Sequence, residues 1–249
     1  MAIATRRAGH DVVGVLSRTP GHGYGPELEW DRELPEADVV LIAVKDDAIT
    51  AVAERLSGHV VNVGVVAHLS GFVPVSSLRV LQEGGTAVGG FHPLQSMPDP
   101  ETGAAGLKGA YVGIDGDSLA IDTLTHLAGS LGLTPFRLTD QARPAYHAAA
   151  AAAANFVVAS LGVSGDLFEA AGVDPEVSEP LVRQVVSNVF EKGASAALTG
   201  PIARGDIETV IGHLTVAREV SEDVGRQFRL MAEATTIRAG RREDLSKWK

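Results

Sequence analysis

The sequence predicts an α/β domain over residues 1–139, followed by an all-helical domain over residues 140–249. Three observations support this division. Short apolar runs alternate with helical stretches in the first part, which is the pattern of a sheet covered by helices. Strand signals stop after Thr139. Alanine then dominates, with seven in a row at positions 148–154, and because alanine favours helices that pack closely, this run indicates a packed helix.

Each predicted strand is a short apolar run bounded by turn residues. The predicted strands are residues 11–16, 37–44, 59–63, 86–91, 110–114 and 134–138. Helical spacing of apolar residues predicts helices over 46–56, 118–131, 140–171 and 174–192, and two more that end near residue 239. Asp174 and Pro175 supply an N-cap and a first-turn proline for the helix that begins there. We expect a loop over residues 200–205 and a frayed, charged tail from residue 240.

Composition excludes several classes of function. The formal net charge of −10 argues against nucleic acid, which is bound mainly through Lys and Arg. The absence of cysteine excludes disulfides and thiolate nucleophiles, and the eight histidines lack metal-binding spacings, so we expect no metal site. The sequence predicts neither a membrane span nor a signal peptide, and we therefore expect a cytoplasmic protein that does not bind membranes.

Ser17, Arg18 and Thr19 follow the predicted strand 11–16 with no acidic residue among them. Ligands of open α/β sheets bind at the carboxyl ends of the strands, where an acidic residue suits the ribose of NAD and an arginine suits the 2′-phosphate of NADP. This pattern favours NADP. The alternative is an exposed turn arginine without a ligand.

Ala43, Val44 and Lys45 lie at the carboxyl end of the next predicted strand. This position also faces the ligand crevice of an open α/β sheet. Asp46 or Asp47, directly afterwards, is equally suited to cap the following helix.

Six segments of the chain resemble a known family when they are taken in order. They are residues 17–19, 43–47, 68–71, 91–95, 146–155 and 198–206. The set is similar to bacterial Rossmann-like proteins that carry the helical domain of unknown function 2520. These proteins are relatives of pyrroline-5-carboxylate reductase and prephenate dehydrogenase in the 6-phosphogluconate-dehydrogenase-like superfamily. The resemblance implies a Rossmann-like dinucleotide-binding domain and a helical domain that binds substrate. We also expect a homodimer through the helical domain, because its apolar helices exceed what one small domain can bury.

The sequence departs from that family at its start. Residues 1–10 look like the end of the first helix, and no G-x-G-x-x-G turn occurs in the sequence. We therefore expect the first strand and the glycine loop, which meets the pyrophosphate, to be missing from the chain as it begins at Met1. Either the true start lies upstream, which we favour, or the protein is a truncated one that binds NADP weakly or not at all.

Ser70 and His92 are the residues best placed for chemistry. Each follows a predicted strand, so both are expected at the same sheet edge. The resemblance to prephenate dehydrogenase implies that they face the reacting group. Histidine can then exchange the proton that accompanies hydride transfer, and serine can orient the substrate oxygen and contact the cofactor. The alternative is that His92 only satisfies a loop carbonyl.

The resemblance also implies substrate contacts from the helical domain. His147 and Asn155 share a broad face of the first long helix but cannot touch each other, since eight residues separate them by about 12 Å. Thr199, Pro201 and Arg204 lie in the predicted loop, where Arg204 can bind a carboxylate or pair with Asp206. His147 and Asn155 have a structural alternative, as buried groups that are satisfied by the backbone.

The sequence thus predicts an NADP-dependent oxidoreductase. It would transfer a hydride between nicotinamide and a small polar, carboxylated substrate, either a keto acid or an imine. The alternative is a non-catalytic dinucleotide-binding or scaffold protein that lacks the pyrophosphate loop.

Overall fold

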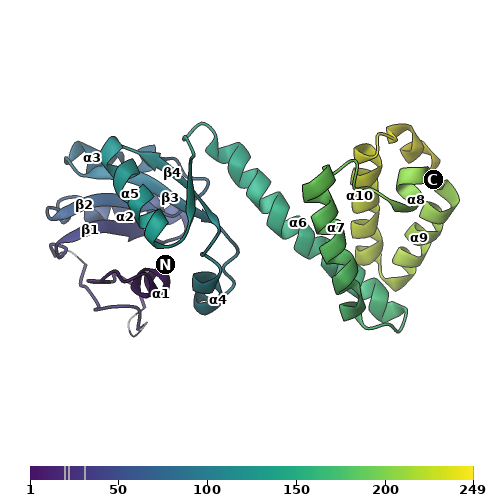
Figure 1. The fold of residues 1–249 in the computed structure, drawn as a ribbon, viewed down its shortest axis with the longest axis horizontal. Helices are drawn as coiled ribbons and strands as arrows, with labels where there is room; N and C mark the ends of the chain where they lie inside the picture. Colours follow the sequence, from purple (N-terminus) through teal and green to yellow (C-terminus); the bar gives the residue numbers. More distant parts are fainter. Residues whose placement is uncertain (20, 22, 31, 249) are drawn as a thin grey trace. The chain divides into compact units, whose positions relative to one another are not determined.

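The computed structural model describes residues 1–19, 21, 23–30 and 32–248. The chain divides into two compact units, Met1–Ala152 and Ala153–Lys249 (Figure 1). The first is an α/β unit and the second is helical, which confirms the predicted fold class. The long helix α6 (Arg143–Ala170) begins just after the predicted boundary at residues 139 and 140. Its residues 143–152 belong to the first unit.

The first unit is built on a five-stranded sheet in which the strands lie side by side in chain order. The strands are β1 (Ala37–Ile42), β2 (Val63–His68), β3 (Ala87–Leu94), β4 (Tyr111–Gly116) and β5 (Thr134–Arg137). Strands β1, β2 and β3 are parallel, β4 runs antiparallel to β3, and β5 is parallel to β4. The carboxyl ends of the first three strands therefore meet at one edge.

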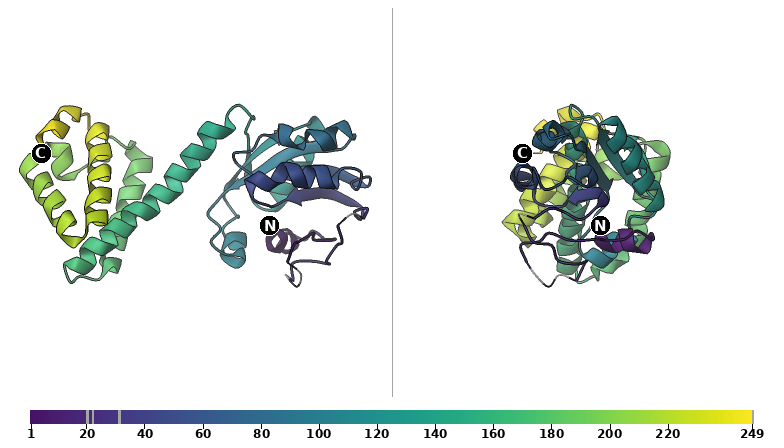
Figure 2. Two further views of the ribbon diagram at one scale, coloured as in Figure 1. Left: turned by 180° about the vertical axis from the view of Figure 1, so that it is seen from behind. Right: turned by 90° about the vertical axis from the view of Figure 1, so that its left-hand side faces the viewer.

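Helices cover both faces of this sheet (Figure 2). Successive residues of β2 point to opposite faces: Val65 packs in a core with Leu124 of α5 (Ser118–Ser130), and Val66 packs in a second core with Ile49 of α2 (Ile49–Leu56). The remaining helical elements of the unit are α1 (Ala2–Arg7), η1 (Asp46–Ala48), η2 (Val75–Leu78), α3 (Arg79–Glu83) and α4 (Pro100–Ala105). The strands between the two cores are consequently apolar on both faces, as parallel strands usually are.

Two of the predicted strands differ from the structure. Residues 11–16 are not a strand of the sheet but form an isolated bridge, in which Val15 pairs with Glu27. Their backbone hydrogen bonds go to residues 26–28, and apolar composition alone cannot supply the neighbouring strand that a sheet requires. Strand β2 begins at Val63, where the sequence predicts it to end, because residues 65–67 rather than residues 60 and 61 enter the sheet.

The second unit consists of helices from residue 153 onward. These elements are the end of α6, η3 (Pro175–Ser178), α7 (Glu179–Lys192), α8 (Gly200–Arg204), α9 (Ile207–Val220), α10 (Glu222–Arg238) and η4 (Arg242–Lys247). As predicted, the Asp174 carboxylate caps the helical segment that starts at Pro175, by accepting a hydrogen bond from the Glu176 amide. Helices α9 and α10 pack on each other through Leu214 and Ala232.

Two segments of this unit are more ordered than the sequence predicts. Residues 200–204 form the short helix α8 rather than a loop, with Pro201 in its first turn. The predicted frayed tail instead folds back as η4, and Trp248 is buried in a core with Leu214. A single tryptophan can bury enough apolar area to hold a charged tail in place.

Helix α6 is long and apolar enough to cross a membrane by length and composition alone, whereas the sequence predicts no membrane span. Its most apolar window has a mean hydropathy of 1.5 and is only 6% buried. Alanine accounts for much of this value, because residues 148–154 are all alanine. This observation is weak evidence for a membrane span, since core helices of other proteins pass the same test.

Candidate active site

Two of the predicted cofactor segments meet at the carboxyl edge of the parallel strands. Ile42, the last residue of β1, is in register with His68, the last residue of β2. The Leu69 amide donates to the Ile42 carbonyl oxygen at 3.1 Å, which holds the two strand ends together. Ala43, Val44 and Lys45 leave β1 at this edge with exposed side chains, and Ser70 leaves β2 beside them.

The sequence predicts that His92 follows a strand, but the structure places it within β3. Strand β3 continues four residues beyond Gly90, the partner of His68, because it pairs with the antiparallel strand β4. His92 is therefore two residues past Gly90, just as Ser70 is two residues past His68. A Cβ atom on Gly71 would lie 2.7 Å from His92 Nε2, so the imidazole rests directly on the Gly71 backbone. The structure thus brings the Ser70 loop and His92 together.

Ser70 organises the loop that follows β2. Its side chain is buried, and Oγ accepts hydrogen bonds from the amides of Phe72 at 3.1 Å and Val73 at 2.9 Å. Serine hydroxyls stabilise turns in this way. Because both contacts use the oxygen as an acceptor, the hydroxyl proton remains available as a donor.

The first turns of α6 place two more rings beside His92. His92 Nδ1 lies 2.7 Å from the hydroxyl oxygen of Tyr146, and the two rings meet edge to face at 5.4 Å between centroids. The His147 ring lies 6.3 Å from the His92 ring and 5.9 Å from that of Phe72. The result is an aromatic cluster in which His92 is hydrogen-bonded to a phenol.

The surroundings of His92 keep its imidazole uncharged at neutral pH. Burial lowers the pKa of His92 to about 4, with smaller contributions from His147 and Arg143 and an opposing one from Asp46. Burial also lowers the pKa of His68 to about 4 and raises the pKa of Tyr146. Tyr146 therefore keeps its proton and His92 offers a lone pair, the combination expected of a hydrogen-bonded proton relay rather than of a charged acid.

Sequence reasoning missed the most buried charged residue of the unit. Arg143 has no exposed surface, and it donates from Nη1 to the Ser70 carbonyl oxygen at 2.9 Å and from Nε to the Asp140 carboxylate at 3.1 Å. Asp140 also accepts hydrogen bonds from the Val75 and Ser76 amides. The sequence feature that could have indicated this contact is Asp140, three residues before Arg143, at the point where the α/β pattern changes to alanine-rich helix.

The Ser17, Arg18 and Thr19 segment has exposed side chains and no regular secondary structure. The Thr19 amide donates to Ser17 Oγ at 3.1 Å, which gives the segment a local turn. Neither Asp46 nor Asp47 is a helix N-cap, contrary to the alternative drawn from the sequence, because Lys45 precedes η1 and Ala48 precedes α2.

The other predicted substrate residues lie in the second unit. Asn155 is exposed on α6, which contradicts the alternative of a buried, satisfied asparagine. Thr199 precedes α8 as its N-cap residue, and Pro201 and Arg204 lie within α8. Asp206 caps α9 by accepting from the Thr209 amide, and hydrogen bonds from Thr209, together with the weaker charge of Arg204, lower the pKa of its carboxyl.

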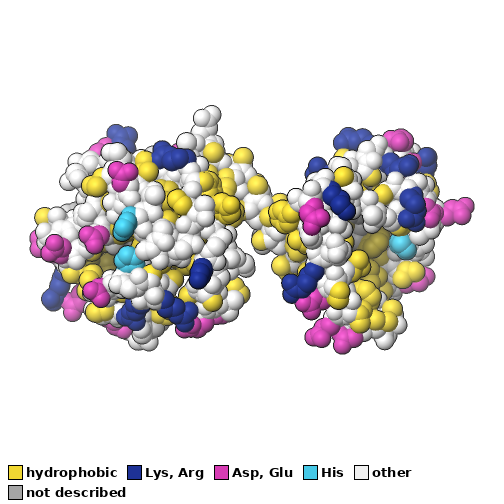
Figure 3. All heavy atoms as spheres, viewed as in Figure 1, with side chains coloured by type: hydrophobic (Ala, Val, Ile, Leu, Met, Phe, Trp, Pro, Cys, Tyr) yellow, Lys and Arg dark blue, Asp and Glu magenta, His cyan; other side chains and the backbone are white. Residues whose placement is uncertain are grey.

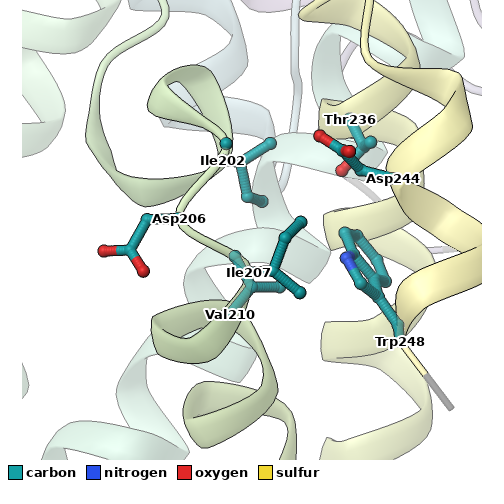
Figure 4. A pocket seen from close by; sticks show the side chains of 8 residues that line it. Ile202, Asp206, Ile207, Val210, Thr236, Asp244 and Trp248 are labelled. Carbon is teal, nitrogen blue, oxygen red and sulfur yellow. The ribbon is translucent and has the colours of Figure 1, made fainter.

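The second unit contains a cavity of about 10 Å³ between α8, α9, α10 and η4 (Figure 4). This volume is roughly that of one water molecule, so the cavity cannot hold a substrate. Its lining consists of Ile202, Gly205, Asp206, Ile207, Val210, Thr236, Asp244 and Trp248. Within the residues that the structure describes, no group of three or more histidine, aspartate or glutamate side chains could hold a metal ion.

The chain consists of an α/β unit, with polar and aromatic side chains at the carboxyl edge of its parallel strands, followed in sequence by a helical unit. The family model described as "Domain of unknown function (DUF2520)" matches residues 110–235, which run from the last strands of the first unit into α10. The chain belongs to this family. No curated protein sequence matches it.

Solved structures share this fold at low sequence identity. A Bacteroides fragilis protein provisionally described as an NADP oxidoreductase superposes with a TM-score of 0.78 and 22% identity, covering 94% of this chain and 92% of the other. The protein TM1727 from Thermotoga maritima has a TM-score of 0.66 and 24% identity, covering 87% and 84%. Pyrroline carboxylate reductase from Plasmodium falciparum, with NADP bound, has a TM-score of 0.63 and 12% identity, covering 93% and 92%.

Proposed function

We propose that this protein is an NADP-dependent oxidoreductase that transfers a hydride between nicotinamide and a small, carboxylated keto acid or imine. One observation carries the proposal: His92, hydrogen-bonded to Tyr146, lies against the backbone of Gly71, next to Ser70, at the carboxyl edge of the parallel strands, where α/β sheets bind ligands. The likeness of the fold to an NADP-bound pyrroline carboxylate reductase supports it.

The residues at this edge suit a dinucleotide. Ala43 is small and exposed at the end of β1, so a flat ring can approach the strand. Arg18 and Lys45 are exposed cations, and Ser17 and Thr19 add hydroxyl groups beside Arg18, which suits a 2′-phosphate. Bound NADPH would supply the hydride. Val44 and Ser70 would line the nicotinamide end of the site.

The chain's own residues would supply protons and orientation. In the reducing direction, neutral His92 would give its ring N–H proton to the substrate oxygen or nitrogen, Nδ1 would take the Tyr146 hydroxyl proton, and solvent would reprotonate the resulting phenolate. The Ser70 hydroxyl donates to the same substrate atom. We further propose that His147 and Asn155 line the substrate pocket, and that Thr199, Pro201 and Arg204 bind the substrate carboxylate.

The proposal is tested first by binding. Titration calorimetry should detect NADPH binding, with NADH bound about tenfold more weakly, because Arg18 pairs only with the 2′-phosphate. Arg18→Ala should remove this preference, whereas Arg79→Ala, which removes an exposed arginine paired with Glu83, should not. NADPH oxidation against a panel of keto acids and cyclic imines then identifies the substrate class. Binding of neither nucleotide would overturn the proposal.

A second candidate is a non-catalytic dinucleotide-binding or scaffold protein with weakened NADP binding. The description of the family to which the chain belongs names no reaction, which is consistent with this candidate. NADPH binding without turnover of any substrate in the panel would support this candidate over the enzyme.

We also propose a homodimer formed through the second unit. Helix α7 buries none of its residues, and its apolar side chains recur at helical spacing on one face. Hydrophobic side chains at the surface are visible in Figure 3. The large exposed ones of α6, η3 and α7 are Phe156, Val157, Val158, Leu161, Val177, Leu181, Val185, Val186 and Phe190. A second copy of this chain would cover these exposed apolar side chains.

The dimer gives the apolar surface a partner other than lipid. We therefore propose that the protein is cytoplasmic and binds neither membranes nor nucleic acid, the latter because of its net charge of −10.

A further inference from the structure

Arg143, the first residue of α6, is a completely buried cation in the first unit. Burying a guanidinium is costly unless its donors are paired. Nη1 and Nε are paired with the Ser70 carbonyl oxygen and the Asp140 carboxylate, but buried Nη2 has no hydrogen-bond partner within the described part of the chain. An apolar side chain of similar length would avoid this cost. Stability alone therefore does not explain an arginine here.

Gly90 of β3 leaves the space that this cation occupies. A Cβ atom on Gly90 would collide with Nη2 of Arg143, so only glycine lets the guanidinium lie against the strand. Gly90 pairs with His68 in the sheet and lies two residues before His92. The charge is thereby placed against the strand that carries His92.

Arg143 also connects the helix to the loop that carries Ser70. The Asp140 carboxylate, which Arg143 holds, accepts hydrogen bonds from the Val75 amide at 2.7 Å and the Ser76 amide at 3.2 Å. The loop is thus fixed at Ser70 by Arg143 directly and at Val75 through Asp140. Charge-assisted hydrogen bonds of this kind are stronger than those between neutral groups.

Several ionisable groups surround His92. Tyr146 and His147 face it from α6, and the charges of Arg143, at the start of that helix, and of Asp46, in η1, act on it. Asp46 favours the charged imidazole, whereas His147 and Arg143 oppose it. Because Arg143 carries a permanent charge, its effect persists at every pH at which the protein is folded.

We propose that Arg143 is a positioning residue of the candidate site, whose hydrogen bonds fix the Ser70 loop and whose charge, held against Gly90 of the strand that carries His92, disfavours a second positive charge on that imidazole. The inference rests on the proposed function only in giving His92 a role in proton transfer. It has two separable parts, because hydrogen-bond geometry acts on the loop and charge acts on the imidazole.

Three variants separate these parts. Arg143→Lys keeps the charge but loses the guanidinium geometry that donates to both Ser70 and Asp140. Asp140→Asn loosens the loop without removing the Arg143 charge. Arg143→Met removes both the charge and these hydrogen bonds. Arg137→Met is the control, since Arg137 is an exposed arginine paired with Asp115. The measurements are imidazole ¹⁵N titration and amide hydrogen exchange by NMR, on the protein without nucleotide or substrate. They therefore test the inference independently of the proposed activity.

We expect the pKa of His92 to rise in Arg143→Met and to stay at the wild-type value in Arg143→Lys, Asp140→Asn and the control. Exchange of the Val75 amide should accelerate about tenfold in Arg143→Lys, Asp140→Asn and Arg143→Met, because a charge-assisted hydrogen bond is weakened in each. If Arg143→Met does not fold, Arg143→Gln provides the neutral variant. An unchanged pKa of His92 in the neutral variant would overturn the proposal. Unchanged exchange of the Val75 amide in both Arg143→Lys and Asp140→Asn would also overturn it.

Discussion

His92 Nδ1 and the hydroxyl oxygen of Tyr146 lie 2.7 Å apart, although 54 residues separate them in the sequence. The strand β3 supplies one partner and the first turn of α6 supplies the other. A neutral imidazole and a protonated phenol at this distance can exchange a proton without either group carrying a charge at rest.

Replacing His92 should lower turnover far more than replacing Tyr146. In NADPH oxidation, His92→Asn is expected to reduce kcat by about 10²-fold or more, the usual contribution of a positioned proton carrier. Tyr146→Phe should reduce kcat about tenfold, because the imidazole remains while the relay is lost. Tyr111→Phe, which alters an exposed tyrosine, is the control. Wild-type turnover by His92→Asn would remove His92 from the mechanism.

The buried histidines should make the first unit sensitive to acid. The pKa values of His68 and His92 are about 4 in the folded protein, against 6.5 as the ordinary value. Between these values the unfolded chain binds more protons than the folded one, so the free energy of unfolding falls as pH falls. Each histidine contributes about 1.4 kcal/mol per pH unit within this window.

Chemical denaturation at several pH values between 4 and 7 measures this slope. His68→Asn should make the slope shallower, because asparagine can still accept the Ser70 amide that now donates to His68 Nδ1. His126→Asn, at an exposed position on α5, should leave the slope unchanged. Equal slopes in wild type and His68→Asn would contradict the assignment of a low pKa to His68.

Adding one methyl group beside His92 should disturb the site without unfolding the protein. A Cβ atom at Gly71 would lie 2.7 Å from His92 Nε2 and 2.9 Å from two ring carbons, so Gly71→Ala forces the imidazole to move. We expect kcat to fall about tenfold or more, since small displacements of a catalytic group are costly. Gly129→Ala is the matched control, because no atom lies within 4 Å of the added methyl group. Equal turnover in both variants would place the reacting atoms elsewhere.

The proposed dimer predicts a change of mass on surface substitution. Phe190 is 87% exposed, and both Phe190→Glu and Leu181→Glu place charge on the apolar face of α7. Sedimentation velocity should give the mass of two chains for wild type and of one chain for either variant. Val61→Glu changes a side chain that is 71% exposed in the first unit and should leave the dimer intact. A monomeric wild type would refute the proposal.

The sequence predicts most of the architecture correctly, because periodic apolar patterns and caps are local signals. The helix from Asp174 and Pro175 and the long alanine-rich helix are examples. Residues 11–16 show the limit of such signals. They have the composition of a strand, yet whether they join a sheet depends on a neighbour that composition does not specify.

The candidate site could be predicted only in part. Ser70 and His92 follow from the rule that parallel strands present their carboxyl ends at one edge. The low pKa of His92 and its contact with Tyr146 could not be predicted, because burial and the register of β3 against β4 determine them. Arg143 was missed because one arginine in a helical segment gives no sign that it will be completely buried.

The hydrogen bond between Arg143 and Ser70 also has a consequence for the order of folding. It closes a loop of 73 residues, and contacts between such distant residues form slowly because closing a long loop costs entropy. We therefore expect the sheet to assemble before the site does, with the histidines still hydrated and titrating normally in a late intermediate. Docking of the first turn of α6 would be the final step. A chain interrupted during folding would therefore have the folded sheet without an assembled candidate site.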